Sequence, residues 1–146
     1  MALLGLIAGA GAVVALDQGA KLIIVRYLQD GAMSLGSLGR IQIVPNRIWL
    51  KQVHGSFTLA NLWRCWAGSM IIVTLFSLFV PPSAPFGALL IGGSVSHLVE
   101  TTYRGAIRDY VRLRFWPRFN LADVAILVGA LGLAAATVQL FCQHIG

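Results

Sequence analysis

The feature that most constrains this chain is a set of four long apolar stretches separated by more polar connections. They cover residues 2–25, 62–80, 86–99 and 121–141. Most approach the roughly 20 residues that an α-helix needs to cross the hydrocarbon core of a bilayer. The third reaches that length only if it continues through Thr101 and Thr102. We therefore predict an all-α, multi-pass membrane protein with four transmembrane helices, folded as a single domain over residues 1–146.

The composition supports lipid as the solvent and lipid headgroups as partners. Charged residues make up 11% of the chain, whereas a soluble domain has about 25%. A net charge of +6 would suggest nucleic acid in a soluble protein, but the eleven Lys and Arg residues lie at or between the ends of the apolar stretches. No basic face with interleaved stacking aromatics is present, so we expect membrane lipids rather than nucleic acid. All eleven also fall on one predicted face, which the positive-inside rule would place in the cytoplasm.

The two long connections predict what lies outside the bilayer. Residues 40–53 partly alternate apolar and polar side chains around Pro45 and Asn46, which predicts a small β-hairpin or sheet with its turn at those two residues. Residues 103–120 mix arginines with aromatic side chains, which favours an interfacial loop or helix. The remaining connection, 81–85, is a short proline-rich turn.

Acidic residues are informative because there are only five of them. Asp17 and Lys21 are four residues apart in the first apolar stretch, so they share a helix face and can form an ion pair. This pair fits either a polar helix end at the membrane interface or a direct role in binding. Asp123 follows Asn120 at the start of the fourth stretch, where helix capping alone would explain both residues.

Asp109 and Asp123 together indicate more than either does alone. Asp109 by itself could simply pair with Arg108 or Arg112. Both acids, however, map to the same end of the predicted bundle. Two carboxyl groups in one site share a proton, and such a pair supplies both a general base and a general acid. We therefore predict a catalytic pair made of Asp109 and Asp123.

Other chemistries have weaker support. His97 and Glu100 are three residues apart, but no third ligand with zinc-site spacing accompanies them, and the two cysteines form no CxxC. Ser94 and Ser96 lack a histidine–acid relay, and no phosphate-binding glycine loop is present. We therefore expect no metal site.

Five elements in order resemble signal peptidase II, the prolipoprotein signal peptidase, over nearly the whole chain. Residues 17–21 resemble its Asp-x-x-x-Lys element, and residues 44–57 resemble its extracytoplasmic sheet region with Asn-x-Gly-x-x-Phe. Residues 92–101 resemble Gly-Gly-x-x-Gly-Asn-Leu-x-Asp-Arg, residues 105–110 resemble Gly-x-Val-x-Asp-Phe, and residues 119–123 resemble Phe-Asn-x-Ala-Asp. The last two are the catalytic elements of the family. The resemblance therefore implies that Asp109 and Asp123 are the catalytic residues.

Several positions depart from the family pattern. The asparagine of the sheet element falls at Val53, next to His54 and Gly55, and the later Asn-Leu-x-Asp-Arg has His97, Glu100 and Thr101 at its polar positions. Arg104 is a candidate to replace the missing arginine. By resemblance and position, the supporting or substrate-binding residues are expected to be Asp17, Lys21, His54, Gly55, His97, Glu100, Arg104 and Asn120.

The resemblance implies a membrane aspartic endopeptidase that cleaves the signal peptide of a lipidated prolipoprotein before its diacylglyceryl-cysteine and needs neither a metal nor an organic cofactor. It also implies a monomer in the bacterial inner membrane, with both termini inside and the active site on the extracytoplasmic side, contrary to the charge rule. Because several polar residues are changed, a catalytically weak paralogue that binds lipidated signal peptides or a membrane partner is the alternative. A purely structural membrane protein would leave the acid pair unexplained.

Overall fold

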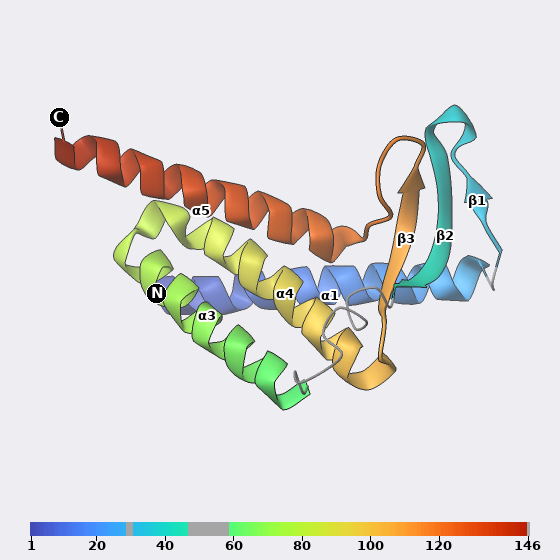
Figure 1. The fold of residues 1–146 in the computed structure, drawn as a ribbon, viewed down its shortest axis with the longest axis horizontal. Helices are drawn as coiled ribbons and strands as arrows, with labels where there is room; N and C mark the ends of the chain where they lie inside the picture. Colours follow the sequence, from blue (N-terminus) through green and yellow to red (C-terminus); the bar gives the residue numbers. More distant parts are fainter. Residues whose placement is uncertain (29–30, 47–58, 146) are drawn as a thin grey trace.

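The computed structural model describes residues 1–28, 31–46 and 59–145, and four long helices dominate it (Figure 1). They are α1 (Ala2–Leu28), α3 (Leu59–Phe79), α4 (Ala84–Arg104) and α5 (Leu121–Ile145). The four predicted helices are confirmed, with ends that differ by up to five residues. The third does continue through the two threonines and ends at Arg104. Gly105 caps it with a φ of 63° and an N–H bond to the carbonyl of Thr101.

Three of these helices, α1, α3 and α5, are long and apolar enough to cross a membrane. Large apolar side chains such as Leu16, Ile72 and Leu131 point outward from them with 63%, 69% and 63% of their surface exposed. Such faces are stable against hydrocarbon but not against water. Helix α4 is less apolar and packs against all three others, so it forms the centre of the bundle.

Two adjacent glycines let α4 approach its neighbours closely. A Cβ atom at Gly92 would lie 2.6 Å from the carbonyl oxygen of Ala10 in α1. One at Gly93 would lie 2.7 Å from the carbonyl oxygen of Ala122 in α5. Backbone-to-backbone packing of this kind is typical of small residues between membrane helices. It brings the first turn of α5 directly against the polar half of α4.

A three-stranded antiparallel sheet stands at one end of the bundle (Figure 1). Its strands are β1 (Met33–Ser34), β2 (Gly39–Asn46) and β3 (Ile107–Leu113), in the order β1-β2-β3. The predicted sheet is confirmed, but the turn expected at Pro45 and Asn46 is wrong. Both residues belong to β2, where Pro45 is paired with Arg108 and Asn46 with Ile107.

Pro45 is tolerated in the strand because β1 pairs with β2 only at Ile41 and Arg40. In the described part of the chain, nothing on that side of Pro45 needs the N–H that proline lacks. The second strand of the expected hairpin, 47–53, lies outside the described residues. The interfacial loop expected at 103–120 contains β3 instead, so the sheet joins both long connections.

Both chain termini and the turn Pro81–Ser83 (η2) lie at the end of the bundle opposite the sheet (Figure 1). The C-terminal end of α1, the C-terminal end of α4 and the N-terminal end of α5 all meet near the sheet. This arrangement brings the predicted polar residues of four separate segments to one end of the molecule.

Candidate functional site

Asp109 and Asp123 lie on either side of Asn120, which contacts both. Asp109, on β3, accepts a 3.0 Å hydrogen bond from Nδ2 of Asn120 to its Oδ1. Its other oxygen, Oδ2, accepts a 2.9 Å bond from Nδ2 of Asn46 on β2. Asp109 is only 4% exposed. Two amide donors from different elements therefore hold a buried carboxyl group in one orientation.

Asp123 is fixed by a reciprocal cap at the start of α5. The backbone N–H of Asn120 donates to Oδ2 of Asp123 at 2.8 Å, and the N–H of Asp123 donates to Oδ1 of Asn120 at 3.0 Å. This is a capping box, with Asn120 as the N-cap and an aspartate at the third helical position. Unlike Asp109, the Asp123 side chain is 39% exposed. The predicted N-cap is thus confirmed, and the same amide group reaches the second acid.

Burial raises the pKa of Asp109 above its ordinary value of 3.8. The hydrogen bond from Asn46 acts in the opposite direction, the negative charge of Asp123 raises the pKa further, and Asn120 and His97 lower it. The net effect favours the protonated form of Asp109. The buried carboxyl group of Asp109 is therefore suited to hold a proton.

His97 approaches the acid pair from α4. Its Nε2 lies 3.1 Å from Oδ1 of Asn120 and 3.5 Å from Oδ1 of Asp123. The 3.1 Å contact is a hydrogen bond when Nε2 carries the proton, because a carbonyl oxygen only accepts. His97 thus adds a donor at the position where the resemblance expected an asparagine.

A buried cluster of charged side chains lies beside the site. Lys21 Nζ lies 2.7 Å from Oδ2 of Asp17 and 2.7 Å from Oε2 of Glu100, and all three side chains are 0% exposed. Arg108 on β3 pairs with Glu100 through its Nε, and its backbone N–H donates to Oε2 of Glu100 at 3.2 Å. Two acids and two bases form a neutral cluster, which is the condition for keeping charges buried. The predicted Asp17–Lys21 pair is confirmed, and both of its side chains are buried inside the bundle.

Asp17 also connects this cluster to the first turn of α5. Its Oδ1 accepts a 3.1 Å hydrogen bond from the N–H of Ala122, next to Asp123, and its Oδ2 accepts a 2.5 Å bond from Oγ of Ser96. The helix dipole of α5 favours a negative charge at this place. Asp17 therefore positions the helix end that carries Asp123.

The remaining predicted site residues are Arg104, His54 and Gly55. Arg104 does not take the place of the missing arginine: it is exposed at the end of α4, and Arg108 contacts Glu100 instead. The chain leaves α4 at Gly105, and β3 brings Arg108 back to Glu100. His54 and Gly55 lie outside the described residues.

Sequence reasoning missed two contributors. The sequence predicts Asn46 in a turn, and only the β2–β3 register places it beside Asp109. The sequence offers Arg108 as a partner of Asp109, yet Arg108 pairs with Glu100, eight residues before it. Its alternation with Asp109 along β3 was the available signal, since neighbouring residues of a strand face opposite sides.

A cavity of about 210 Å³ opens beside Asp123. The other side chains that line it are apolar, namely Leu113, Trp116, Phe119, Val124 and Leu127. An apolar cavity with one carboxylate at its wall suits a hydrophobic chain whose reacting group is polar. Among the described residues, no group of three or more His, Cys, Asp and Glu side chains could hold a metal ion.

The fold and the site together define a helical membrane protein in which Asp109 and Asp123 both contact Asn120 at one end of the bundle. The family model for signal peptidase (SPase) II matches residues 9–139, and the chain belongs to the signal peptidase II family, a family of proteases.

Among similar proteins, the lipoprotein signal peptidase of Moorella thermoacetica is 29% identical over 131 residues, covering 82% of this chain and 83% of that protein. The lipoprotein signal peptidase of Anaplasma marginale is 30% identical over 128 residues, covering 82% and 75%. A bacterial membrane enzyme solved by the in meso method at 1.9 Å resolution has the same fold, with a TM-score of 0.75, 18% identity, and coverage of 90% of this chain and 91% of that one.

Proposed function

We propose that this protein is an aspartic endopeptidase that cleaves the signal peptide from lipidated prolipoproteins before the diacylglyceryl-cysteine. The observation that carries the proposal is the meeting of Asp109 and Asp123 around Asn120. Membership in the signal peptidase II family supports proteolysis, and the names of the similar proteins support a lipoprotein substrate.

The differing environments of the two acids assign their roles. Asp123 is 39% exposed and lines the apolar cavity, so it is the general base that takes a proton from water as the water oxygen attacks the scissile carbonyl carbon. Asp109, whose pKa is raised by burial, donates its proton to the carbonyl oxygen. A neutral gem-diol results. When it collapses, the C–N bond breaks, Asp123 gives its proton to the leaving nitrogen, and one diol hydroxyl returns a proton to Asp109.

The surrounding residues act by positioning. Asn120 and Asn46 fix the Asp109 carboxyl group, and the capping box fixes Asp123, so neither acid has to reorganise during the reaction. His97 donates toward Asn120 and Asp123. The apolar cavity beside Asp123 accepts the hydrophobic part of the substrate. Neither a metal nor an organic cofactor has a role in this mechanism.

We further propose a monomer in the bacterial inner membrane, with the sheet end on the extracytoplasmic side. Both termini lie at the opposite end, which is consistent with an even number of membrane crossings. The charge rule counts eleven basic residues at the sheet end, but Lys21 and Arg108 are neutralised by buried acids and do not act as loop charges. Reporter fusions at both termini test this orientation: reporters active only in the cytoplasm support it, and reporters active only outside refute it.

Cleavage and binding are to be measured separately on a synthetic diacylglyceryl-cysteine signal peptide with the purified protein. We expect D109N and D123N each to lower cleavage at least about 10³-fold while peptide binding changes by less than about threefold. The Gln42→Ala variant, on β2 but without a hydrogen bond to either acid among the described residues, serves as the control. Wild-type cleavage by either aspartate variant would refute the pair. A wild-type protein that binds the peptide without cleaving it would instead support the catalytically weak paralogue.

A further inference from the structure

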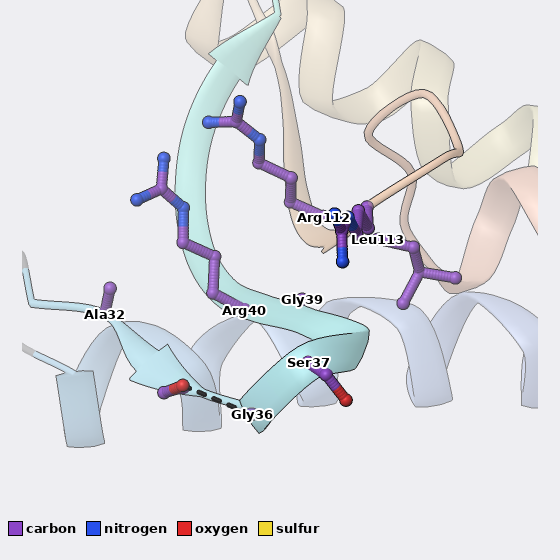
Figure 2. Close-up of a pocket in the computed structure, with 9 residues that line it drawn as sticks. Ala32, Gly36, Ser37, Gly39, Arg40, Arg112 and Leu113 are labelled. Atoms are coloured by element: carbon purple, nitrogen blue, oxygen red, sulfur yellow. Dashed lines mark hydrogen bonds between the residues drawn. The ribbon is translucent and has the colours of Figure 1, made fainter.

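A second cavity, of about 670 Å³, lies on the sheet and shares only Leu113 with the cavity beside Asp123 (Figure 2). Its charged lining comes from three arginines, Arg40, Arg112 and Arg114. Ser34 and Ser37 add hydroxyl groups to the wall. The cavity therefore offers guanidinium and hydroxyl donors, which are the groups that bind phosphate in proteins.

Two of these arginines are held side by side at a cost in stability. Arg40 on β2 is the direct cross-strand partner of Arg112 on β3. Figure 2 shows their side chains leaving the sheet in the same direction. Like charges directly opposite each other destabilise an antiparallel pair. An anion bound between them would remove that repulsion.

None of the acidic side chains that the structure describes neutralises this cluster. Asp17 and Glu100 pair with Lys21 and Arg108 inside the bundle. Asp109 and Asp123 are engaged around Asn120. The positive charge of the cavity is therefore available to a ligand.

The backbone, not counter-charges, keeps the arginines together. Gly39 has a φ of 150°, and a Cβ atom there would collide with the carbonyl oxygen of Arg112, so only glycine lets β2 approach β3 this closely. The N–H of Leu35 donates to the carbonyl of Gly39 at 2.9 Å, and the N–H of Arg114 donates to the carbonyl of Leu38 at 3.1 Å. The cavity is thus formed before any ligand arrives.

Exposed aromatic side chains place the cavity at the level of the lipid headgroups. Phe115 and Trp116 directly follow the last arginine of the cavity and are 89% and 61% exposed. Tyr27, in the last turn of α1, is 80% exposed at the same end of the bundle. Aromatic residues of membrane proteins gather at the interface between hydrocarbon and headgroups. A phosphate of the membrane surface is the anion that this position provides.

We propose that the cavity lined by Arg40, Arg112 and Arg114 binds the phosphate of an anionic phospholipid headgroup. The diacylglyceryl group of a lipidated prolipoprotein carries no phosphate, so this is a site for a second lipid and does not depend on the proposed proteolysis. The bound lipid would hold the sheet against the membrane surface next to the acid pair.

The test uses the full-length protein in nanodiscs of equal parts phosphatidylglycerol and phosphatidylcholine, with retained lipids counted by native mass spectrometry. We expect R40Q/R112Q to lower the preference for phosphatidylglycerol about thirty-fold, which corresponds to about 2 kcal/mol, or about 1 kcal/mol for each arginine. The matched control R64Q/R118Q loses the same charge outside the cavity and should keep the preference. If the double variant does not fold, R40Q and R112Q alone should each lower the preference about fivefold.

The second readout is the Tm, and the change caused by R112Q should have opposite signs in the two lipids. In pure phosphatidylcholine, R112Q should raise the Tm, because it relieves the repulsion by Arg40; in pure phosphatidylglycerol it should lower the Tm, because the headgroup loses a partner. An equal loss of preference in the control would show general surface attraction and overturn the site. Displacement of the lipid by 10 mM inorganic phosphate would show a free-anion site and overturn the lipid assignment.

Discussion

Lys21→Met tests whether the buried charge cluster holds the site together. Lys21 neutralises two carboxylates, each at 2.7 Å, and no part of the three side chains reaches the surface. At an effective dielectric constant of about 20, each pair is worth about 6 kcal/mol of gross Coulomb attraction. Desolvation offsets most of it, so removing one partner of a buried pair costs about 3–5 kcal/mol.

We therefore expect K21M to lower the free energy of unfolding by about 3–5 kcal/mol, measured by SDS titration of the protein in mixed micelles. The double variant D17N/K21M leaves Glu100 paired with Arg108 and removes the orphaned charge of Asp17. It should recover at least about half of the loss, which gives a coupling energy that the double-mutant cycle measures directly. A K21M cost below about 1 kcal/mol, or losses that simply add in the double variant, would refute the reasoning.

Three further predictions concern the acid pair and its supports. Because the pKa of Asp109 is raised above 3.8, the native state binds more protons than the unfolded state between that value and the raised pKa, so stability should fall as pH rises through this window. D109N should remove this fall from a plot of unfolding free energy against pH, measured by unfolding titrations at several pH values. The same slope in the variant and the wild type would contradict the prediction. Asn46→Ala removes a donor that lowers the pKa of Asp109, so the alkaline limb of the cleavage profile should move to higher pH, whereas Gln42→Ala should leave it in place. Gly93→Ala should lower the free energy of unfolding by about 1–3 kcal/mol and lower cleavage, because its Cβ would lie 2.7 Å from the carbonyl oxygen of Ala122. Gly68→Ala, whose Cβ would meet no atom within 4 Å, should change neither quantity. Equal effects of the two substitutions would rule out close packing as the cause.

Much of the helical framework could be predicted because membrane spans carry their signal locally. A run of about 20 apolar residues predicts its own helix whatever its neighbours do. The third helix was the difficult one, because its second half carries the buried polar residues Ser96, Glu100 and Thr101. Their burial depends on partners from α1 and β3, which hydropathy does not reveal.

The sheet and the finer contacts of the site depend on pairing between distant segments. Arg40 faces Arg112, and Asn46 reaches Asp109, only through the register of β2 against β3. Pro45 and Asn46 have the composition of a turn, and tertiary pairing overrides it. The placement of both acids at one end of the bundle could be predicted, because Asp109 lies in the connection between the last two helices and Asp123 in the first turn of the last one. The link from Asp17 to Ala122 could not, because it joins residues 105 positions apart.

The hydrogen bond from Ala122 to Asp17 has a consequence for the insertion of the protein into the membrane. The helix end bearing Asp123 is held by a residue of the first membrane segment, while Asp109 arrives on a strand between the third and the last. During synthesis, every earlier stage of insertion therefore contains at most one of the two carboxyl groups. The proposed acid pair is complete only when the final segment enters the bilayer.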